Sequence, residues 1–259
     1  MSDTTIRRPI RWSSAENTNV GMVREVNEDS ILSAPALQLW VVADGMGGYE
    51  AGNVASNMIV QALGELSSLT SISDMVDSVE DCLIDANHRI LEYADIMLDG
   101  RTLGSTVVTL LIKGHVGICL WAGDSRLYRY RNKQLIQLSR DHSQVEEMLL
   151  QGLLTPEEAE NHPDSNVITR AIGASQEVYI DIDVFNVQLG DSFFLCSDGL
   201  YNMVSDEEIC DVISRLPVDE AVETLVQMAL DEGANDNVSV ILVKGEPDAA
   251  FSTQVNLQE

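Results

Sequence analysis

Residues 37–48 read LQLWVVADGMGG, an apolar run that ends in an aspartate followed by a series of glycines. The apolar part, residues 37–43, is short and bounded by turn residues, which predicts a buried strand. Two helices are expected next, at residues 51–66 and 74–98. The second places apolar side chains three and four positions apart on one face. This strand and helix pair form the first block of the fold.

The remaining sequence predicts further blocks of strands and a second pair of helices. Strands are expected at residues 105–112, 116–122, 126–131, 134–138, 178–184, 192–196 and 238–243, and helices at 205–216 and 218–231. Consecutive strands without an intervening helix favour antiparallel sheets, and paired helices favour outer layers. We therefore predict an α+β fold: a four-layer α-β-β-α sandwich with two central antiparallel sheets.

Two capping boxes mark helix starts. Ser205 is followed three residues later by Glu208, and Thr155 by Glu158, with a proline in the first turn of the latter helix. The second box lies within residues 141–173, a stretch that is otherwise expected to be irregular.

The chain of 259 residues is 45% apolar, so it can bury a core, and it has 42 acidic against 15 basic residues. A net charge of −27 argues against nucleic acid and anionic membrane as partners, because both are bound through Lys and Arg. We expect one domain at residues 15–245, with an N-terminal extension at 1–14 and a flexible polar tail at 246–259.

Four cysteines lie in apolar stretches without any C-x-x-C pair, and we expect buried, reduced thiols. We find no secretory signal at the N-terminus and no apolar run of the roughly 18 residues that a membrane span needs. A cytoplasmic protein is expected, with a monomer as the default state.

Aspartates recur where apolar strands end. Asp44 follows LWVVA, Asp124 follows CLWAG, Asp198 follows FFLCS, and Asp236 directly precedes the run NVSVILV. A single such aspartate is usually a turn residue. Four of them at strand ends can converge, and clustered carboxylates repel one another unless cations neutralise them. Oxygen ligands without Cys or His at metal spacing favour Mg²⁺ or Mn²⁺ over zinc.

A polar segment near the N-terminus, GMVREVNED at residues 21–29, adds a second set of charged side chains. It could be a simple connector before a strand. Its chemistry also fits a phosphate site, because Arg24 is suited to forked phosphate contacts and Glu28 and Asp29 are adjacent carboxylates.

Seven short motifs occur along the chain in the same order as in a known protein family. They are Arg24-x-x-Asn27-Glu28-Asp29, Asp44-Gly45-Met46-Gly47-Gly48-x-x-x-Gly52-x-x-Ala55-Ser56, Gly104-Ser105-Thr106, Gly123-Asp124-Ser125-Arg126, Thr169-Arg170-Ala171-Ile172-Gly173, Ser197-Asp198-Gly199-Leu200 and Asp236-Asn237-Val238-Ser239. With these motifs the chain resembles the bacterial branch of the metal-dependent protein phosphatases (PPM family, protein phosphatase type 2C), over about residues 15–245.

The resemblance implies a role for each motif residue. Asp44 would bridge two metals, one of them also bound by the Gly45 carbonyl, and Asp198 and Asp236 would complete the other shell. Asp124 would hold a weaker third metal together with Asp198. The remaining site residues are Glu28 and Asp29, expected to act near the metals through bound waters, and Arg24, expected to bind the substrate phosphate.

The implied reaction is hydrolysis of phosphoserine or phosphothreonine by direct attack of a hydroxide that bridges the first two metals. Eukaryotic members have a histidine where this chain has Met46, as bacterial members commonly do. The general acid is therefore open, and a metal-bound water is our hypothesis. His142 and His162 are expected to have structural or surface roles.

Residues 141–173 correspond to the family's flap, a segment beside the active site. A lid and an inert surface loop are both compatible with its sequence. The expected partners are phosphorylated proteins, including a kinase or its substrates, and type VI secretion is one hypothetical context.

Other phosphatase chemistries fail on spacing. None of the cysteines has an arginine six positions on, and Asp181-x-Asp183 lacks the Thr or Val that an aspartyl-phosphate enzyme needs two positions later. Residues 44–52 match neither G-x-G-x-x-G nor Walker A. A phosphatase of small-molecule phosphoesters and a pseudophosphatase that binds phosphoproteins remain as alternatives.

Overall fold

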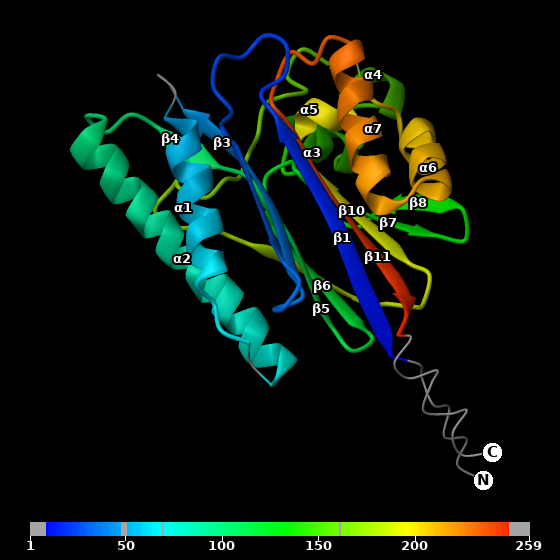
Figure 1. The fold of residues 1–259 in the computed structure, drawn as a ribbon. Coiled ribbons are helices and arrows are strands. Elements are labelled where there is room, and N and C mark those ends of the chain that lie inside the picture. The colour runs from blue at the N-terminus through cyan, green and yellow to red at the C-terminus, as the bar shows by residue number, and fades with distance from the viewer. Residues whose placement is uncertain (1–8, 48–50, 69, 161, 249–259) are drawn as a thin grey trace, which may run out of the picture.

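Two antiparallel sheets lie face to face, and a pair of helices covers the outer face of each (Figure 1). The computed structural model describes residues 9–47, 51–68, 70–160 and 162–248. Within these residues no helix is both long and apolar enough to cross a bilayer. The four-layer α-β-β-α sandwich predicted from the sequence is confirmed.

The first sheet has the strand order β1-β11-β10-β7-β8. Its strands are β1 (Ile10–Asn19), β11 (Val238–Pro247), β10 (Ser192–Cys196), β7 (Arg126–Arg131) and β8 (Gln134–Gln137). Strands β1 and β11 pair along their whole length, from Ile10 opposite Pro247 to Asn19 opposite Val238. Pairing thus extends into both ranges expected as terminal extensions, whose outer parts, 1–8 and 249–259, lie outside the described residues.

The second sheet has the order β2-β3-β5-β6-β9, with β4 beside β3. Its strands are β2 (Asp29–Ala34), β3 (Leu39–Gly47), β4 (Leu103–Ser105), β5 (Val107–Lys113), β6 (Val116–Ala122) and β9 (Asp181–Asn186). The stretch quoted at the start of the sequence analysis forms β3, whose first five residues are fully buried. Gly48, part of the same motif, lies outside the described residues.

The helices divide between the two outer faces and one end of the sandwich. They are α1 (Gly52–Gly64), α2 (Ile72–Met97), α3 (Gln144–Leu150), α4 (Pro156–Glu160), α5 (Asp198–Tyr201), α6 (Asp206–Arg215) and α7 (Val218–Asp231). Helices α1 and α2 cover the second sheet, and α6 and α7 cover the first (Figure 1). The predicted capping box at Ser205 is present in full, because Ser205 and Glu208 each bond the other's backbone N–H.

Apolar side chains fill the three spaces between the four layers. Trp40 and Phe193 are fully buried between the two sheets, while Ile59 and Leu83 join helices α1 and α2 to the second sheet. Burying such side chains stabilises the fold by about 1.5–3 kcal/mol each. The layered core fixes the ends of the strands, where the charged residues lie.

Four expectations about local structure are wrong. The strand expected at 105–112 is divided at Thr106, because that residue bonds Asp44 through both its N–H and its hydroxyl. The strand expected at 178–184 runs instead over Asp181–Asn186, at the edge of its sheet, and leaves Val184 62% exposed. Residues 141–173 contain helix α3 in addition to α4, the helix whose start was expected at Thr155. Cys82 and Cys210 are only half-buried, unlike the buried Cys119 and Cys196, and all four are free thiols.

Candidate metal centre

Five aspartates meet at one end of the sandwich, although they come from segments far apart in the chain. Asp29 begins β2 and lies directly opposite Asp44 of β3. Asp198 begins α5 at the end of β10, Asp124 lies in the turn between β6 and β7, and Asp236 precedes β11. In Figure 1 the β1–β2 loop and the α7–β11 loop both lie at this upper end. The convergence that the strand-end pattern predicts is therefore present.

The carboxyl groups of this cluster hold their protons more tightly than ordinary aspartates. Burial raises the pKa of Asp29 and of Asp198 to about 6 and that of Asp124 to about 7. Asp44 keeps some accessible surface but is densely surrounded by protein atoms, and burial raises its pKa well above the usual range. The charges of the other four aspartates raise it further. The cluster thus needs positive charge in order to ionise fully.

Asp29 provides the test of whether a cation fits. Its Oδ2 accepts a hydrogen bond from Ser197 Oγ at 2.8 Å, and the nearby Ser239 hydroxyl also lowers its pKa, whereas its Oδ1 is buried and no donor in the described part of the chain lies within hydrogen-bond geometry. A buried carboxylate oxygen without a donor is costly, and a hard divalent cation offsets that cost. The donor set around Asp29 consists of carboxylates, hydroxyls and backbone carbonyls, which suits Mg²⁺ or Mn²⁺.

The carboxylates do not yet surround a single point as a complete shell. Among the residues that the structure describes, no group of three or more His, Cys, Asp or Glu side chains is arranged as a ready set of metal ligands. Binding a cation here therefore calls for small movements of the carboxylates or for ligands from water and backbone carbonyls, such as that of Gly45.

Glu28 holds the backbone beside the cluster. Its Oε1 accepts the N–H of Gly52 at 2.7 Å, and its carbonyl accepts from Gly45 N–H and from Ser56 Oγ. Gly45 and Gly52 approach so closely that a Cβ on Gly45 would lie 2.1 Å from the Gly52 carbonyl oxygen. The structure therefore gives Glu28 a backbone contact, and explains why both glycines are needed.

Arg24 reaches the cluster from the loop between β1 and β2. Its Nη2 donates to Asp236 Oδ2 at 2.7 Å, and its side chain remains 51% exposed. That hydrogen bond raises the pKa of Arg24, and the nearby charges of Glu28 and Asp198 add to the effect. The guanidinium is thus both fixed at the rim and open to solvent, as a phosphate-binding group must be.

Asn237 is a site residue that the sequence analysis did not single out. Its Oδ1 accepts the Glu28 N–H at 2.8 Å, and its Nδ2 donates to the carbonyls of Val20 and Val26. One side chain thereby ties both ends of the Arg24 loop to the segment that contains Asp236. Its place in a motif was the available signal, but only the fold reveals contacts across more than 200 residues of sequence.

The histidines lie outside the carboxylate cluster. His142 is buried and its Nδ1 accepts the Gly123 N–H at 3.1 Å. Met46, at the position of the histidine in eukaryotic relatives, lies in β3 beside Gly104. Neither residue supplies an acid to the centre.

Comparison with known proteins agrees with this geometry. The family model described as protein phosphatase 2C matches residues 23–242. Protein phosphatase PhpP of Streptococcus pneumoniae is 39% identical over 242 residues, which cover 90% of this chain and 97% of that protein. The structure of PppA from Pseudomonas aeruginosa, described as a key regulatory component of T6SS, is 41% identical with a TM-score of 0.85, covering 92% of this chain and all of that one.

A third relative was solved with metal. The catalytic domain of the serine/threonine protein phosphatase PstP in complex with two manganese ions is 32% identical, with a TM-score of 0.83, and the alignment covers 92% of this chain and 99% of that one. The family match runs from just before Arg24 to the strand that follows Asp236 and so includes all five aspartates. The chain therefore belongs to the protein phosphatase 2C family.

Proposed function

We propose that this chain is a metal-dependent serine/threonine protein phosphatase. The observation that carries the proposal is the five-aspartate cluster with the unpartnered Oδ1 of Asp29 at its centre and Arg24 at its rim. The names of the relatives, protein phosphatase PhpP and serine/threonine phosphatase stp, support the same substrate class.

Asp44, Asp198, Asp236 and the Gly45 carbonyl would hold two divalent cations, Mn²⁺ or Mg²⁺. Asp124, with Asp198, would hold a weaker third one. When bound, such cations act as Lewis acids and activate water for attack on phosphorus. Asp29, which lies opposite Asp44, and Glu28, whose carbonyl accepts the Gly45 N–H, would act near the metals through bound waters.

Arg24 has a distinct task in this scheme. In the structure its guanidinium neutralises Asp236. A cation bound by Asp236 would compete for that carboxylate and release the guanidinium, which can then bind two oxygens of the substrate phosphate. With Met46 in place of a histidine, we propose that solvent water protonates the departing serine or threonine oxygen.

We further propose phosphorylated proteins as the substrates, in opposition to a serine/threonine kinase. A monomer in the cytoplasm is the simplest setting, and the four free cysteines fit a reducing compartment. The likeness to PppA, which is described as a key regulatory component of T6SS, makes regulation of type VI secretion a candidate context. Small-molecule phosphoesters remain the alternative substrate class.

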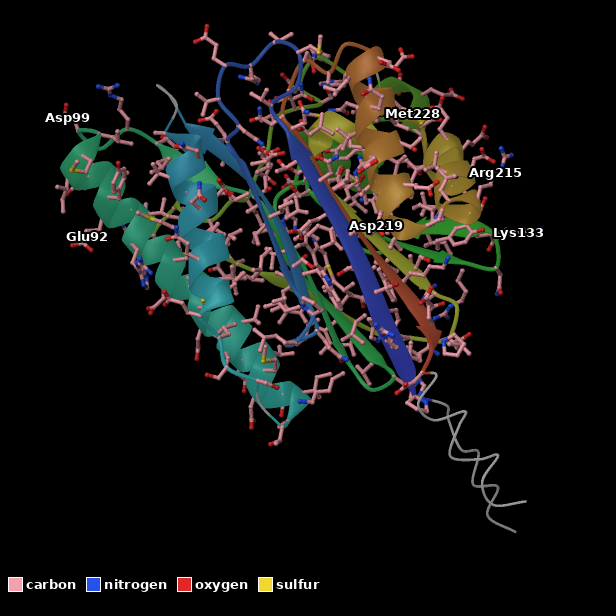
Figure 2. All side chains as sticks on the ribbon, in the orientation of Figure 1. Glu92, Asp99, Lys133, Arg215, Asp219 and Met228 are labelled. Atoms are coloured by element: carbon pink, nitrogen blue, oxygen red, sulfur yellow. The ribbon has the colours of Figure 1, made fainter. Side chains whose placement is uncertain are left out.

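The first experiment is hydrolysis of a phosphothreonine peptide with Mn²⁺, with EDTA, and by Asp44→Asn. A matched control is Asp219→Asn, because Asp219 is an exposed residue in the first turn of helix α7, where Figure 2 labels it. We expect activity that requires metal, disappears in Asp44→Asn and persists in Asp219→Asn. If metal-loaded wild type turns over neither this peptide nor p-nitrophenyl phosphate, the enzyme proposal is wrong and the pseudophosphatase reading takes its place.

A further inference from the structure

The turn that contains Asp124 is fastened to one residue of the flap (residues 141–173). Gly123 donates its N–H to Nδ1 of His142 at 3.1 Å, and its carbonyl accepts the backbone N–H of His142 at 2.9 Å. Both polar backbone groups of Gly123 are therefore bonded to His142. Gly123 has φ +114°, and a Cβ there would lie 2.6 Å from Thr106, so this conformation requires glycine.

The imidazole of His142 is held in one orientation. It is only 7% exposed and stacks on Trp121 with ring centroids 6.0 Å apart and planes 13° from parallel. Because Nδ1 accepts from Gly123, the hydrogen resides on Nε2, which lies 3.3 Å from Asp181 Oδ2. Burial lowers the pKa of His142, which favours this neutral form. The ring thus acts as a fixed acceptor for the Gly123 N–H.

His142 also joins the beginning of the flap to its end, and these two segments together form the flap base (residues 142–144 and 167–169). The His142 carbonyl accepts the N–H of Thr169 at 2.8 Å, and Gln144 N–H donates to the Val167 carbonyl at 2.9 Å. Arg170 then donates to Asp181 Oδ1 at 2.7 Å, beside the oxygen that faces His142. A displacement of the flap base must therefore move His142 or break these bonds.

On the other side, Thr106 connects the Asp124 turn to Asp44. Its Oγ1 lies 2.7 Å from Ser125 Oγ and accepts the Asp44 N–H at 3.1 Å, while its own N–H donates to the Asp44 carbonyl at 2.8 Å. The route from the flap base through His142, Gly123 and Thr106 thus reaches two aspartates of the cluster by direct contacts.

We propose that His142 is a positioning residue that sets the place of Asp124 through the Gly123 N–H, and so couples the flap base to the affinity of the weakest metal site. The inference rests on the proposed function for its metal, but the hydrogen bond between Gly123 and His142 involves no metal ligand atom. The proposal also gives the flap a function. If a bound substrate changed the conformation of the flap, the position of the Asp124 carboxylate would change with it.

Two substitutions separate this role from simple packing. His142→Phe keeps an aromatic ring against Trp121 but deletes the acceptor. His142→Asn deletes the ring but keeps an acceptor oxygen the same number of bonds from Cα as Nδ1. The control is His162→Phe, because His162 is also in the flap and accepts a backbone N–H, but only from Asp164 in its own turn.

The readouts are amide exchange of Gly123 by NMR, histidine ¹⁵N shifts that report the tautomer, and Mn²⁺ binding by calorimetry, together with kcat and KM. In His142→Phe we expect Gly123 exchange to accelerate by about tenfold. The weakest-bound Mn²⁺ should lose affinity by about ten- to hundredfold, as when ligand-orienting groups are removed. We expect kcat to fall at low Mn²⁺ and recover at high Mn²⁺, with KM unchanged.

His142→Asn should retain slow Gly123 exchange and Mn²⁺ affinity near wild type, and His162→Phe should change neither. The proposal is overturned if His142→Phe leaves both quantities at wild-type values, or if His142→Asn loses as much as His142→Phe. Exchange and tautomer are measured on the metal-free protein, so they test this inference even if no phosphopeptide is hydrolysed, an outcome that would count against the proposed function alone.

Discussion

Asp191 and Asp198 lie at opposite ends of strand β10, and their surroundings differ in one decisive respect. Asp191 is 1% exposed, yet Arg131 bonds both of its oxygens at 2.6 and 2.7 Å, and the Gln188 N–H donates to it as well. Asp198 faces other carboxylates instead, and burial together with the charge of Asp236 raises its pKa to about 6. The fold can therefore supply a cation to a buried aspartate, whereas at the other end of the strand Arg24 is the arginine that pairs with Asp236, and Arg126 offsets only part of the charge of Asp124.

This difference separates stability from function. At the Asp191 end the buried charge has its partner within the protein and helps to hold β10 beside β7. At the Asp198 end the carboxylates repel one another, which lowers the stability of the fold unless a bound ligand brings positive charge. Substitutions at the two ends should consequently have opposite effects on activity and on the free energy of unfolding.

The largest effect is expected for Asp198→Asn. Loss of a ligand shared by two metal sites should lower kcat/KM on a phosphopeptide by about 10³-fold or more, which corresponds to several kcal/mol of charge stabilisation. The free energy of unfolding in EDTA should stay level or rise, because one repelling carboxylate is gone. Steady-state kinetics and urea unfolding measure the two quantities. Retention of activity within tenfold of wild type would contradict the assignment.

Asp191→Asn should do the reverse. It leaves Arg131, whose side chain is 18% exposed, without its ionic partner, and this should lower the free energy of unfolding by about 3–5 kcal/mol. The activity of the folded fraction should be unchanged. A double variant, Arg131→Met with Asp191→Leu, removes both charges and should recover part of the lost stability in urea unfolding. An activity loss in Asp191→Asn at full folding would show that the two ends are not independent.

The pH dependence of stability gives the next test. The pKa values of Asp29 and Asp124 rise from the ordinary 3.8 to about 6 and 7 on folding. Between these values the folded state binds more protons than the unfolded state, so the metal-free protein should lose stability as pH rises from about 4 to 7. The loss should be on the order of a few kcal/mol, since one unit corresponds to roughly 1.4 kcal/mol.

Unfolding in urea at several pH values, in EDTA and in Mn²⁺, measures this dependence. Manganese should flatten it, because the cation replaces the protons. Glu158 and Glu208 have lowered pKa values and act in the opposite direction, but only below about pH 4.5, at the lower edge of this window. The lowered pKa of His142 also acts in the opposite direction, below its ordinary value of 6.5, and one imidazole opposes several carboxyl groups. A metal-free protein that becomes more stable from pH 4 to 7 would overturn the electrostatic account of the cluster.

The elements that could be predicted from the sequence are those with a local apolar pattern of their own. Strands β3, β6 and β10 are short apolar runs, and α7 has a clear apolar face, so local pattern was enough to locate them. Strand β1, IRWSSAENTN, has no such pattern and is a strand because β11 supplies its partners. Helix α3 was missed because the stretch around it is polar and broken by turns.

In the site, Asp44, Asp124, Asp198 and Asp236 were identifiable because each lies at the end of an apolar strand, and Asp29 because it ends the charged segment 21–29. The roles of Asn237 and His142 were not, since they consist of contacts with Glu28 and Gly123 that only the tertiary fold creates. A position beside strand β10 does not by itself distinguish Asp191 from Asp198; only the motif Ser197-Asp198-Gly199-Leu200 singles out Asp198. Their difference depends on Arg131, sixty residues away, and no local pattern records it.

The smallest expected effect concerns Arg24, the arginine that forms an ion pair with Asp236 of the cluster. Arg24→Ala should lower kcat/KM by about ten- to hundredfold, mainly through KM, because a forked contact to phosphate is worth about 1.5–3 kcal/mol. Its exposed pair with Asp236 should contribute at most about 1 kcal/mol to stability. Arg24→Lys keeps the charge but not the forked guanidinium, so it should recover only part of the loss.

Arg215→Ala, which breaks an exposed pair with Asp211, is the matched control and should leave kinetics unchanged. If Arg24→Ala instead destabilises the protein as strongly as Asp191→Asn, then Arg24 serves the fold as Arg131 does, and the phosphate must be bound by another group.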